Sequence, residues 1–384
     1  MFSIVGFRFW IWFGMAMPLI FFLPQGISQV LSLSAVDSSL VRLSFKQLEP
    51  AINPIQPTVA GVIVSHQFVM AQSHTNLLES QLNKLDTSGA QAHVGIGVLD
   101  LNTGESWFQN GLQRFPMQSV FKLPLSIVVL KLVDSGKLSL SQLVTISSQD
   151  FAGYSPILKE IKGNSAQFTV RDLLERSIGM SDNTAADALA RLVGGPQKVT
   201  AILHQMNLRG IRVDRLEQQL QPDCVGLKNF RPELAPELAN EQRYKEAVDK
   251  IPVRVKQAAL ETYLTDPRDT ATPEDMVALL AKLQSHQLLS EKSKALLLKI
   301  MTDSSTGQHR LKAGLPQGWS IAHKTGTGPE VLGIGTATND VGIISSPTGR
   351  HIALAVFIAG SKAPVASREK VMESIASAVV KAIQ

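Results

Sequence analysis

The sequence is short of the residues that disulfide frameworks, metal centres and nucleic-acid surfaces require. It has one cysteine, Cys224, which excludes a disulfide within the chain. No cluster among the eight histidines has metal-ligand spacing, which argues against a zinc hydrolase, and we expect neither a metal nor another cofactor. The formal net charge is only +5 and the basic residues form no dense run. We therefore expect no nucleic-acid partner.

The composition is that of a globular protein. Of the 384 residues, 44% are hydrophobic and 18% are charged, which is too apolar for a disordered chain. This length suffices for one large domain or two modest ones.

The N-terminal segment has the pattern of an export signal. Residues 1–28 hold one basic residue, Arg8, followed by the apolar stretch Phe9–Leu23. An uncleaved membrane anchor is the alternative, although the stretch is somewhat short for a span of ~20 residues. Residues 29–74 contain three central prolines and are predicted to be a linker or tail, unless the second apolar patch at 59–69 is the true signal. We expect a periplasmic or secreted protein that contacts a membrane only through the N-terminal segment, and only if that segment is uncleaved.

A serine and a lysine stand three residues apart at the start of a long apolar run. From Lys122 the spacing of Leu, Ile and Val predicts a buried helix about four turns long. Residues i and i+3 share a helix face, so the Ser119 hydroxyl and the Lys122 amine should lie within hydrogen-bond reach. The free N–H groups of the first helical turn would stand where an oxyanion forms during acyl transfer. This pair is a candidate nucleophile with its activating amine.

Two further motifs follow in order, Ser181-Asp182-Asn183 and Lys324-Thr325-Gly326. Together with Ser-x-x-Lys they are the signature of class A β-lactamases and penicillin-binding proteins. From about Leu78 to the C-terminus the sequence resembles a class A serine β-lactamase. The resemblance implies a hydrolase of β-lactam antibiotics that works as a monomer, with a small-molecule β-lactam as its substrate.

The predicted fold is of the α/β type, with a catalytic domain over residues 75–384. The pattern of periodicity predicts strands at 93–99, 105–108, 319–324, 333–345 and 351–359, and a terminal helix at 367–383. The resemblance implies a five-stranded antiparallel sheet flanked by terminal helices, with an all-helical subdomain inserted and the active site in the cleft between them. The α/β part comprises 75–117 and 300–384, and the helical part comprises 118–299, where Thr169-Val170-Arg171-Asp172 predicts a capping box.

The resemblance also assigns roles to individual residues. Ser181 relays a proton to the leaving nitrogen, and Lys324 steadies Ser181 and the substrate carboxylate. The backbone N–H of Thr327 joins that of Ser119 as an oxyanion donor. The remaining expected substrate-binding residues are Asn183, Thr325, Gly326, Tyr154 and Arg310. Arg310 is expected to bind the substrate carboxylate, and the alternative is that it is a solvated surface arginine.

Hydrolysis of an acyl-enzyme needs a base, and the resemblance places it in a loop after the Ser-Asp-Asn motif. Glu217 lies 217 − 181 = 36 residues after Ser181, in the family's register, and is the predicted deacylation base. Gln221 stands where the family has an asparagine that helps to hold the hydrolytic water. Arg215 and Asp269 are expected to form the structural ion pair of this loop.

The loop is roughly forty residues longer than the family's, well beyond the usual length of an unstructured loop. Within the insert, at about 222–265, the apolar spacing predicts a helix with one hydrophobic face, formed by Tyr244, Val248, Ile251, Val255 and Leu260. Such an insert could be a lid, a partner-binding patch or a neutral addition. Two alternatives to a β-lactamase therefore stay open: a peptidoglycan D,D-peptidase or penicillin-binding protein that deacylates slowly, and a non-enzymatic β-lactam or muropeptide sensor.

Overall fold

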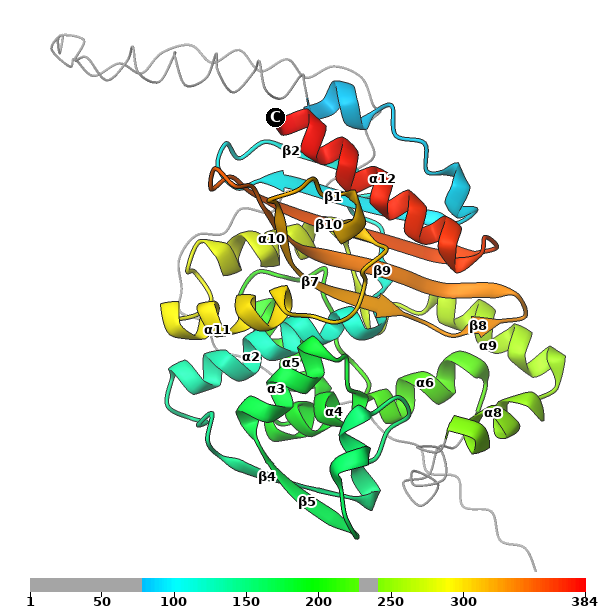
Figure 1. Ribbon diagram of the computed structural model, residues 1–384. Coiled ribbons are helices and arrows are strands. Elements are labelled where there is room, and N and C mark those ends of the chain that lie inside the picture. The colour runs from blue at the N-terminus through cyan, green and yellow to red at the C-terminus, as the bar shows by residue number, and fades with distance from the viewer. Residues whose placement is uncertain (1–77, 228–240) are drawn as a thin grey trace, which may run out of the picture. The chain divides into compact units, whose positions relative to one another are not determined.

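The structure is a computed structural model, and it describes residues 78–227 and 241–384 (Figure 1). The predicted signal or anchor at 1–28 and the predicted linker at 29–74 lie outside the described residues. Within the two described ranges, no helix is both long and apolar enough to cross a lipid bilayer.

A twisted antiparallel sheet forms the upper half of the protein in Figure 1. Its strands run in the order β2-β1-β10-β9-β7, and the short β8 (Glu330–Val331) pairs with β9. The five main strands confirm the predicted sheet, because each overlaps a stretch predicted from residue alternation. They are β1 (His93–Asp100), β2 (Ser106–Gln109), β7 (Ser320–Thr327), β9 (Ile334–Ser345) and β10 (His351–Ser361).

Both faces of the sheet are buried, as the side-chain alternation of β10 shows. Ile352, Leu354, Val356 and Ile358 join the core beneath α12 (Val365–Ile383), which also contains Leu78 and Leu82. The residues between them on β10 point to the other core, which the helical half covers. Successive side chains of a strand point to opposite faces of the sheet, so a strand between two apolar layers needs apolar residues at consecutive positions. The terminal helix was predicted at 367–383 and begins two residues earlier.

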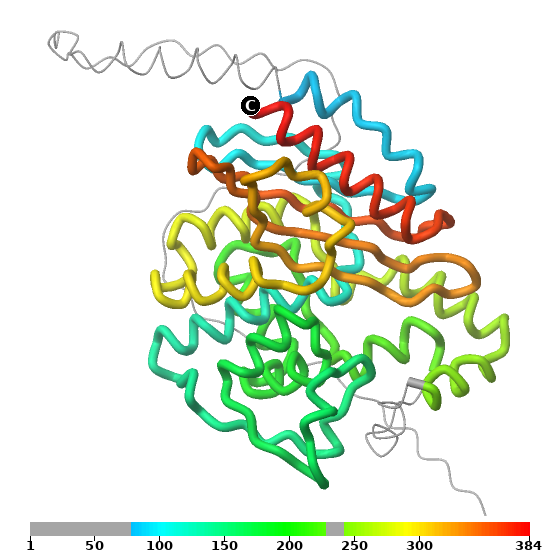
Figure 2. The backbone as a smooth tube through the Cα atoms, viewed as in Figure 1, coloured from blue at the N-terminus to red at the C-terminus, as the bar shows by residue number. Residues whose placement is uncertain are grey.

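The helical half lies against the opposite face of the sheet. Figure 2 shows the chain leaving the sheet region, running through the helices and returning through α11 (Glu291–Thr302) into β7. The capping box predicted at Thr169 and Asp172 is present at the start of α3, with Asp172 N donating to Thr169 Oγ1 at 3.1 Å. Outside the long insert, the helices of this half are α2 (Lys122–Asp134), α3 (Val170–Gly179), α4 (Asn183–Leu192), α5 (Pro196–Gln205), α6 (Glu217–Val225), α10 (Pro273–Gln284) and α11 (Glu291–Thr302).

The resemblance had implied that this half is all-helical, but the structure also contains short strands here. β4 (Leu143–Ser147) pairs with β5 (Ser165–Thr169), and β3 (Phe115–Pro116) pairs with β6 (Thr270–Ala271). Both pairs satisfy backbone groups in segments that no helix includes. The β3–β6 pair also ties the chain just before Ser119 to the end of the long loop, since Met117 N donates to Asp269 O at 3.0 Å.

The insert forms two helices where the sequence predicted one. α8 (Glu241–Asp249) and α9 (Val253–Thr265) are separated at Pro252, whose ring cannot continue the α8 hydrogen-bond ladder. The predicted apolar face does pack, because Tyr244, Val248 and Ile251 lie against the cluster of Val225, Leu260 and Val331. Val255 is half-buried. The insert is therefore docked on α6 and on the β8 end of the sheet.

Candidate active site

Ser119 and Lys122 lie where the sheet meets the helical half. Ser119 is in the 3₁₀ turn η2 (Gln118–Phe121), which leads into α2, and Lys122 Nζ is 2.9 Å from Ser119 Oγ. The predicted proximity of the two groups is therefore present, although the serine precedes the α-helix by one turn of 3₁₀ geometry. Ser119 is half-buried, whereas the Lys122 side chain is fully buried. The hydroxyl can be approached from outside while the amine cannot.

The Ser181-Asp182-Asn183 tripeptide brings two polar side chains to Lys122. Lys122 Nζ donates to Ser181 O at 2.8 Å and to Asn183 Oδ1 at 2.5 Å. Ser181 has a left-handed backbone conformation with φ +60°, which interrupts the chain between α3 and α4. Its side chain faces the site, where Lys324 Nζ donates to it. Asp182 has a separate task as the N-cap of α4, accepting from Ala185 N at 2.8 Å.

Lys324 reaches the same site from the end of β7. Its Nζ donates to Ser181 Oγ at 2.9 Å and to Thr325 O at 2.8 Å. Burial, helped by the nearby charge of Lys122, lowers the pKa of Lys324 well below its ordinary value. Because its proton is held weakly, this amine can exchange a proton with Ser181, and an anionic ligand would raise its pKa again.

Glycine at position 326 lets β7 approach the turn that contains Ser119 closely. A Cβ there would lie 2.4 Å from Met117 O and 3.2 Å from Val120 N, so a larger residue would push the strand away from η2. Thr327, the last residue of β7, is exposed beside this contact. Thr325 Oγ1 bonds Thr306 Oγ1 at 2.8 Å.

The long loop brings Glu217 close to Ser119, although the two residues are 98 positions apart in the sequence. Its Oε1 lies 3.5 Å from Ser119 Oγ and 3.2 Å from Lys122 Nζ. Its Oε2 accepts from Gln221 Nε2 at 2.8 Å, one turn along α6. The carboxylate is almost completely buried and is held between a cation and an amide.

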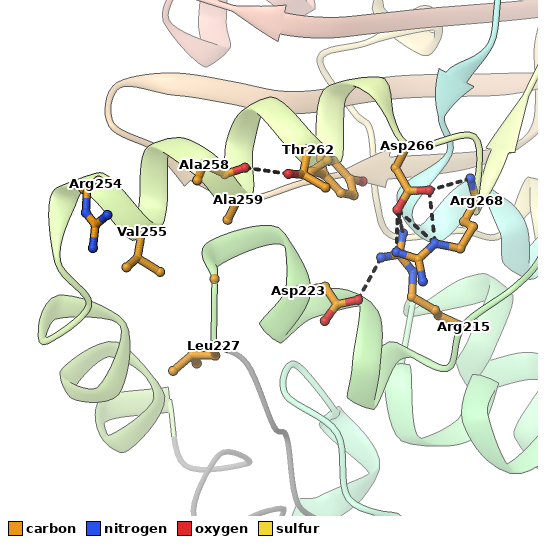
Figure 3. Close-up of a pocket in the computed structure, with 12 residues that line it drawn as sticks. Arg215, Asp223, Leu227, Arg254, Val255, Ala258, Ala259, Thr262, Asp266 and Arg268 are labelled. Atoms are coloured by element: carbon orange, nitrogen blue, oxygen red, sulfur yellow. Dashed lines mark hydrogen bonds and ion pairs between the residues drawn. The ribbon is translucent and has the colours of Figure 1, made fainter. Parts of the chain in front are cut away.

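The loop that carries Glu217 is fastened by an arginine surrounded by three carboxylates. Arg215 Nε lies 2.6 Å from Asp269 Oδ2, which confirms the predicted ion pair. Arg215 also pairs with Asp223 at 2.9 Å and with Asp266 at 3.4 Å (Figure 3). This network borders a cavity of about 480 Å³ between α6 and α9, apart from the groups around Ser119.

The sequence reasoning missed a second fastening of the same loop. Asp187 on α4 is fully buried and accepts hydrogen bonds from the backbone N–H groups of Glu217 (2.7 Å) and Gln218 (3.0 Å). Burial, and next the charge of Glu217, raises the pKa of Asp187 to about 7. The signal that could have revealed it is its position one helical turn after Asn183, on the same face of α4.

Arg310 and Tyr154 border the site without joining the group around Lys122. Arg310 is buried, which rules out the surface alternative, and its guanidinium donates to Asn339 O (2.9 Å) and to Thr327 Oγ1 (2.8 Å). It therefore braces the end of β7. Tyr154 is 69% exposed, and its carbonyl oxygen accepts from Asn183 N at 3.3 Å.

The arrangement is typical of one class of protein, the serine acyl-transfer enzymes: a serine hydroxyl lies beside two buried amines and a buried carboxylate. In the two described ranges, no three His, Cys, Asp or Glu side chains are grouped to hold a metal ion.

Comparison with known proteins identifies the family. Residues 77–383 match the model of the β-lactamase enzyme family. The chain is 32% identical to the β-lactamase VEB-1 of Pseudomonas aeruginosa, over 74% of this chain and 83% of that protein. It is also 32% identical to the extended-spectrum β-lactamase PER-1 of Pseudomonas aeruginosa, over 82% of this chain and 90% of that protein.

Comparison with solved structures identifies the same family. A reconstructed ancestral class A β-lactamase superimposes with a TM-score of 0.63 and 32% identity, covering 79% of this chain and 99% of the other. The TLA-1 extended-spectrum β-lactamase gives a TM-score of 0.65 and 26% identity, with 82% and 99% covered. The chain belongs to the β-lactamase enzyme family, and within it to class A.

Proposed function

We propose that this class A serine β-lactamase opens the ring of β-lactam antibiotics through an acyl-enzyme on Ser119, and that water activated by Glu217 hydrolyses the acyl-enzyme. The observation that carries the proposal is the Glu217 carboxylate, 3.5 Å from Ser119 Oγ and held by Lys122 and Gln221. A slowly deacylating penicillin-binding protein or a sensor has no need of a buried carboxylate at this position.

In the first half of the reaction, Ser119 Oγ attacks the carbonyl carbon of the ring. Its proton passes to Lys122 Nζ, which is its nearest acceptor when deprotonated, or through a water to Glu217. The ring C–N bond then breaks, and Ser181, supported by Lys324, delivers a proton to the leaving nitrogen. The N–H groups of Ser119 and Thr327 stabilise the oxyanion.

In the second half, Glu217 takes a proton from water as the water oxygen attacks the ester carbonyl. The ester C–O bond breaks, and Ser119 Oγ recovers a proton. Gln221, one methylene longer than the family's asparagine, still offers an amide to this region and uses it to orient Glu217. Arg310 and Lys324 supply positive charge for the substrate carboxylate, next to Thr325, and Asn183 and Tyr154 line the route to Ser119.

Turnover of a chromogenic cephalosporin by the purified protein tests the proposal. Wild type should release many equivalents of product, and Ser119→Ala should release none and lose covalent labelling by a fluorescent penicillin, with an unchanged melting temperature. Product that stops at one equivalent in wild type would instead support the penicillin-binding alternative, and labelling that persists in Ser119→Ala would show that another residue is the nucleophile.

We also propose that the protein is exported, because Arg8 and Phe9–Leu23 have the signal pattern and its β-lactam substrates would be met outside the cytoplasm. Cell fractionation checks this: full-length protein confined to the cytosolic fraction would contradict export.

A further inference from the structure

The insert between Gln221 and Asp266 reaches the catalytic carboxylate through buried side chains. Tyr263, near the end of α9, is 5% exposed and packs with Leu220 and Cys224 of α6. α9 also packs on the β8 end of the sheet through Leu260. Figure 1 shows α9 between α6 and β8. The insert is therefore part of the wall behind Glu217.

A chain of hydrogen bonds runs from α9 to the base. Gln118 Nε2 donates to the Tyr263 hydroxyl, and Gln118 Oε1 accepts from Gln221 Nε2 at 3.0 Å. The other proton of the same Gln221 amide goes to Glu217 Oε2 at 2.8 Å. Gln118 is also the residue immediately before Ser119 and has a left-handed backbone, with φ +47°.

Every link in this chain is needed to fix the next. Gln118 is 1% exposed, so its amide has no water to bond if a protein partner is lost. Its remaining partner, Cys224 Sγ at 3.5 Å, is a weak acceptor. Without the Tyr263 hydroxyl the Gln118 amide would turn to find another partner and release Gln221. Within the described part of the chain, Gln221 is the one donor to Glu217 Oε2.

The Cys224 and Tyr263 side chains in this hydrogen-bond network stay protonated at neutral pH. Burial raises the pKa of Cys224 to about 12 and raises the pKa of Tyr263 well above its ordinary value. Both groups stay neutral at neutral pH, so they orient Glu217 without adding charge to it.

We propose that Tyr263 is a positioning residue for deacylation, acting on Glu217 through Gln118 and Gln221, so that the insert completes the catalytic site. The proposal rests on the proposed role of Glu217. It gives the insert a specific task, in place of a lid, a partner-binding patch or a neutral addition.

Tyr263→Phe in the full chain removes one hydroxyl and keeps the ring. We expect the deacylation rate constant, measured by mass spectrometry of the penicilloyl adduct, to fall roughly ten- to hundredfold, as small displacements of a catalytic group do. The acylation rate constant, measured by stopped flow, should fall much less, because Lys122 Nζ stays beside Ser119 Oγ and can take its proton. A structural loss would lower both together.

Tyr244→Phe is the matched control. Its hydroxyl also joins the insert to α6, donating to the backbone oxygen of Gln221 at 3.3 Å, but it does not touch the side-chain amides. We expect wild-type deacylation from this variant. Equal slowing by Tyr244→Phe and Tyr263→Phe would overturn the proposal, because it would indicate general support of α6 by the insert.

Gln118→Met removes the other partner of the hydrogen bond between Gln118 and Tyr263. This variant tests the same proposal if Tyr263→Phe folds poorly. It should slow deacylation to a similar degree, and adding Tyr263→Phe to it should cause no further slowing, since the two residues act in series. Additive effects, or wild-type deacylation in both single variants, would refute the positioning role. If wild type itself fails to turn over β-lactams, the proposed function fails and not this link alone.

Discussion

Replacement of Glu217 by Gln should convert the protein from a catalyst into a β-lactam trap. In the wild type, Gln221 Nε2 donates a hydrogen bond to Glu217 Oε2 at 2.8 Å. A glutamine at position 217 has the same shape and can still accept this hydrogen bond, but its amide cannot take a proton from water. General-base catalysis contributes about 10²- to 10⁴-fold, or about 3 to 5 kcal/mol of activation free energy, so deacylation should slow by that factor. Acylation should slow less, because Lys122 Nζ remains 2.9 Å from Ser119 Oγ.

The cost in stability should be smaller than for a typical broken buried ion pair. Removing one partner of such a pair costs about 3 to 5 kcal/mol because the other charge is left alone. Lys122 would keep Ser119 Oγ, Ser181 O and Asn183 Oδ1 within 2.9 Å. The variant should therefore fold, which lets the kinetic effect be read directly.

The assay is intact-protein mass spectrometry after mixing with benzylpenicillin. Glu217→Gln should carry one penicilloyl group on Ser119 for minutes to hours, whereas wild type should show only a transient adduct. Gln219→Ala, on the exposed side of the same helical turn, should behave as wild type. Hydrolysis by Glu217→Gln at the wild-type rate would refute the reasoning, because the water would then be activated by another group.

The remaining predictions concern the two fastenings of the loop. Arg215→Ala leaves the Asp269 carboxylate buried without its cation, so we expect the unfolding free energy to fall by about 3 kcal/mol. Deacylation should also slow, but by less than in Glu217→Gln. The control Arg212→Ala replaces a side chain that is 35% exposed and should change neither quantity. The pKa of Asp187 is raised from 3.8 to about 7, so the folded state binds more protons between these pH values and the contribution of Asp187 to stability is lost as the pH rises through them. Melting temperatures across pH 4 to 8 should show wild type losing stability relative to Asp187→Asn; parallel curves would contradict the raised pKa.

Much of this protein follows from local patterns in its sequence. The strands and the terminal helix were predictable because a buried strand and an amphipathic helix repeat their apolar residues at fixed periods. The closeness of Ser119 and Lys122 was predictable for the same reason, since helical geometry fixes the distance between residues three apart. Glu217 needed the family's register in addition, because it approaches Ser119 across 98 residues.

The tertiary structure decided what no local period encodes. Tyr263 meets Gln118 across 145 residues, and Asp187 meets the backbone of Glu217 across 30. Each is a single polar residue whose partner is set by how α4, α6 and α9 pack, so neither has a pattern in the sequence. The burial of Arg310 behind β7 has the same origin. The sequence by itself determined the five main strands, the terminal helix and the chemical groups of the site. Packing determined which buried groups hold those chemical groups in place, because an isolated buried polar group takes the partner that the fold brings to it.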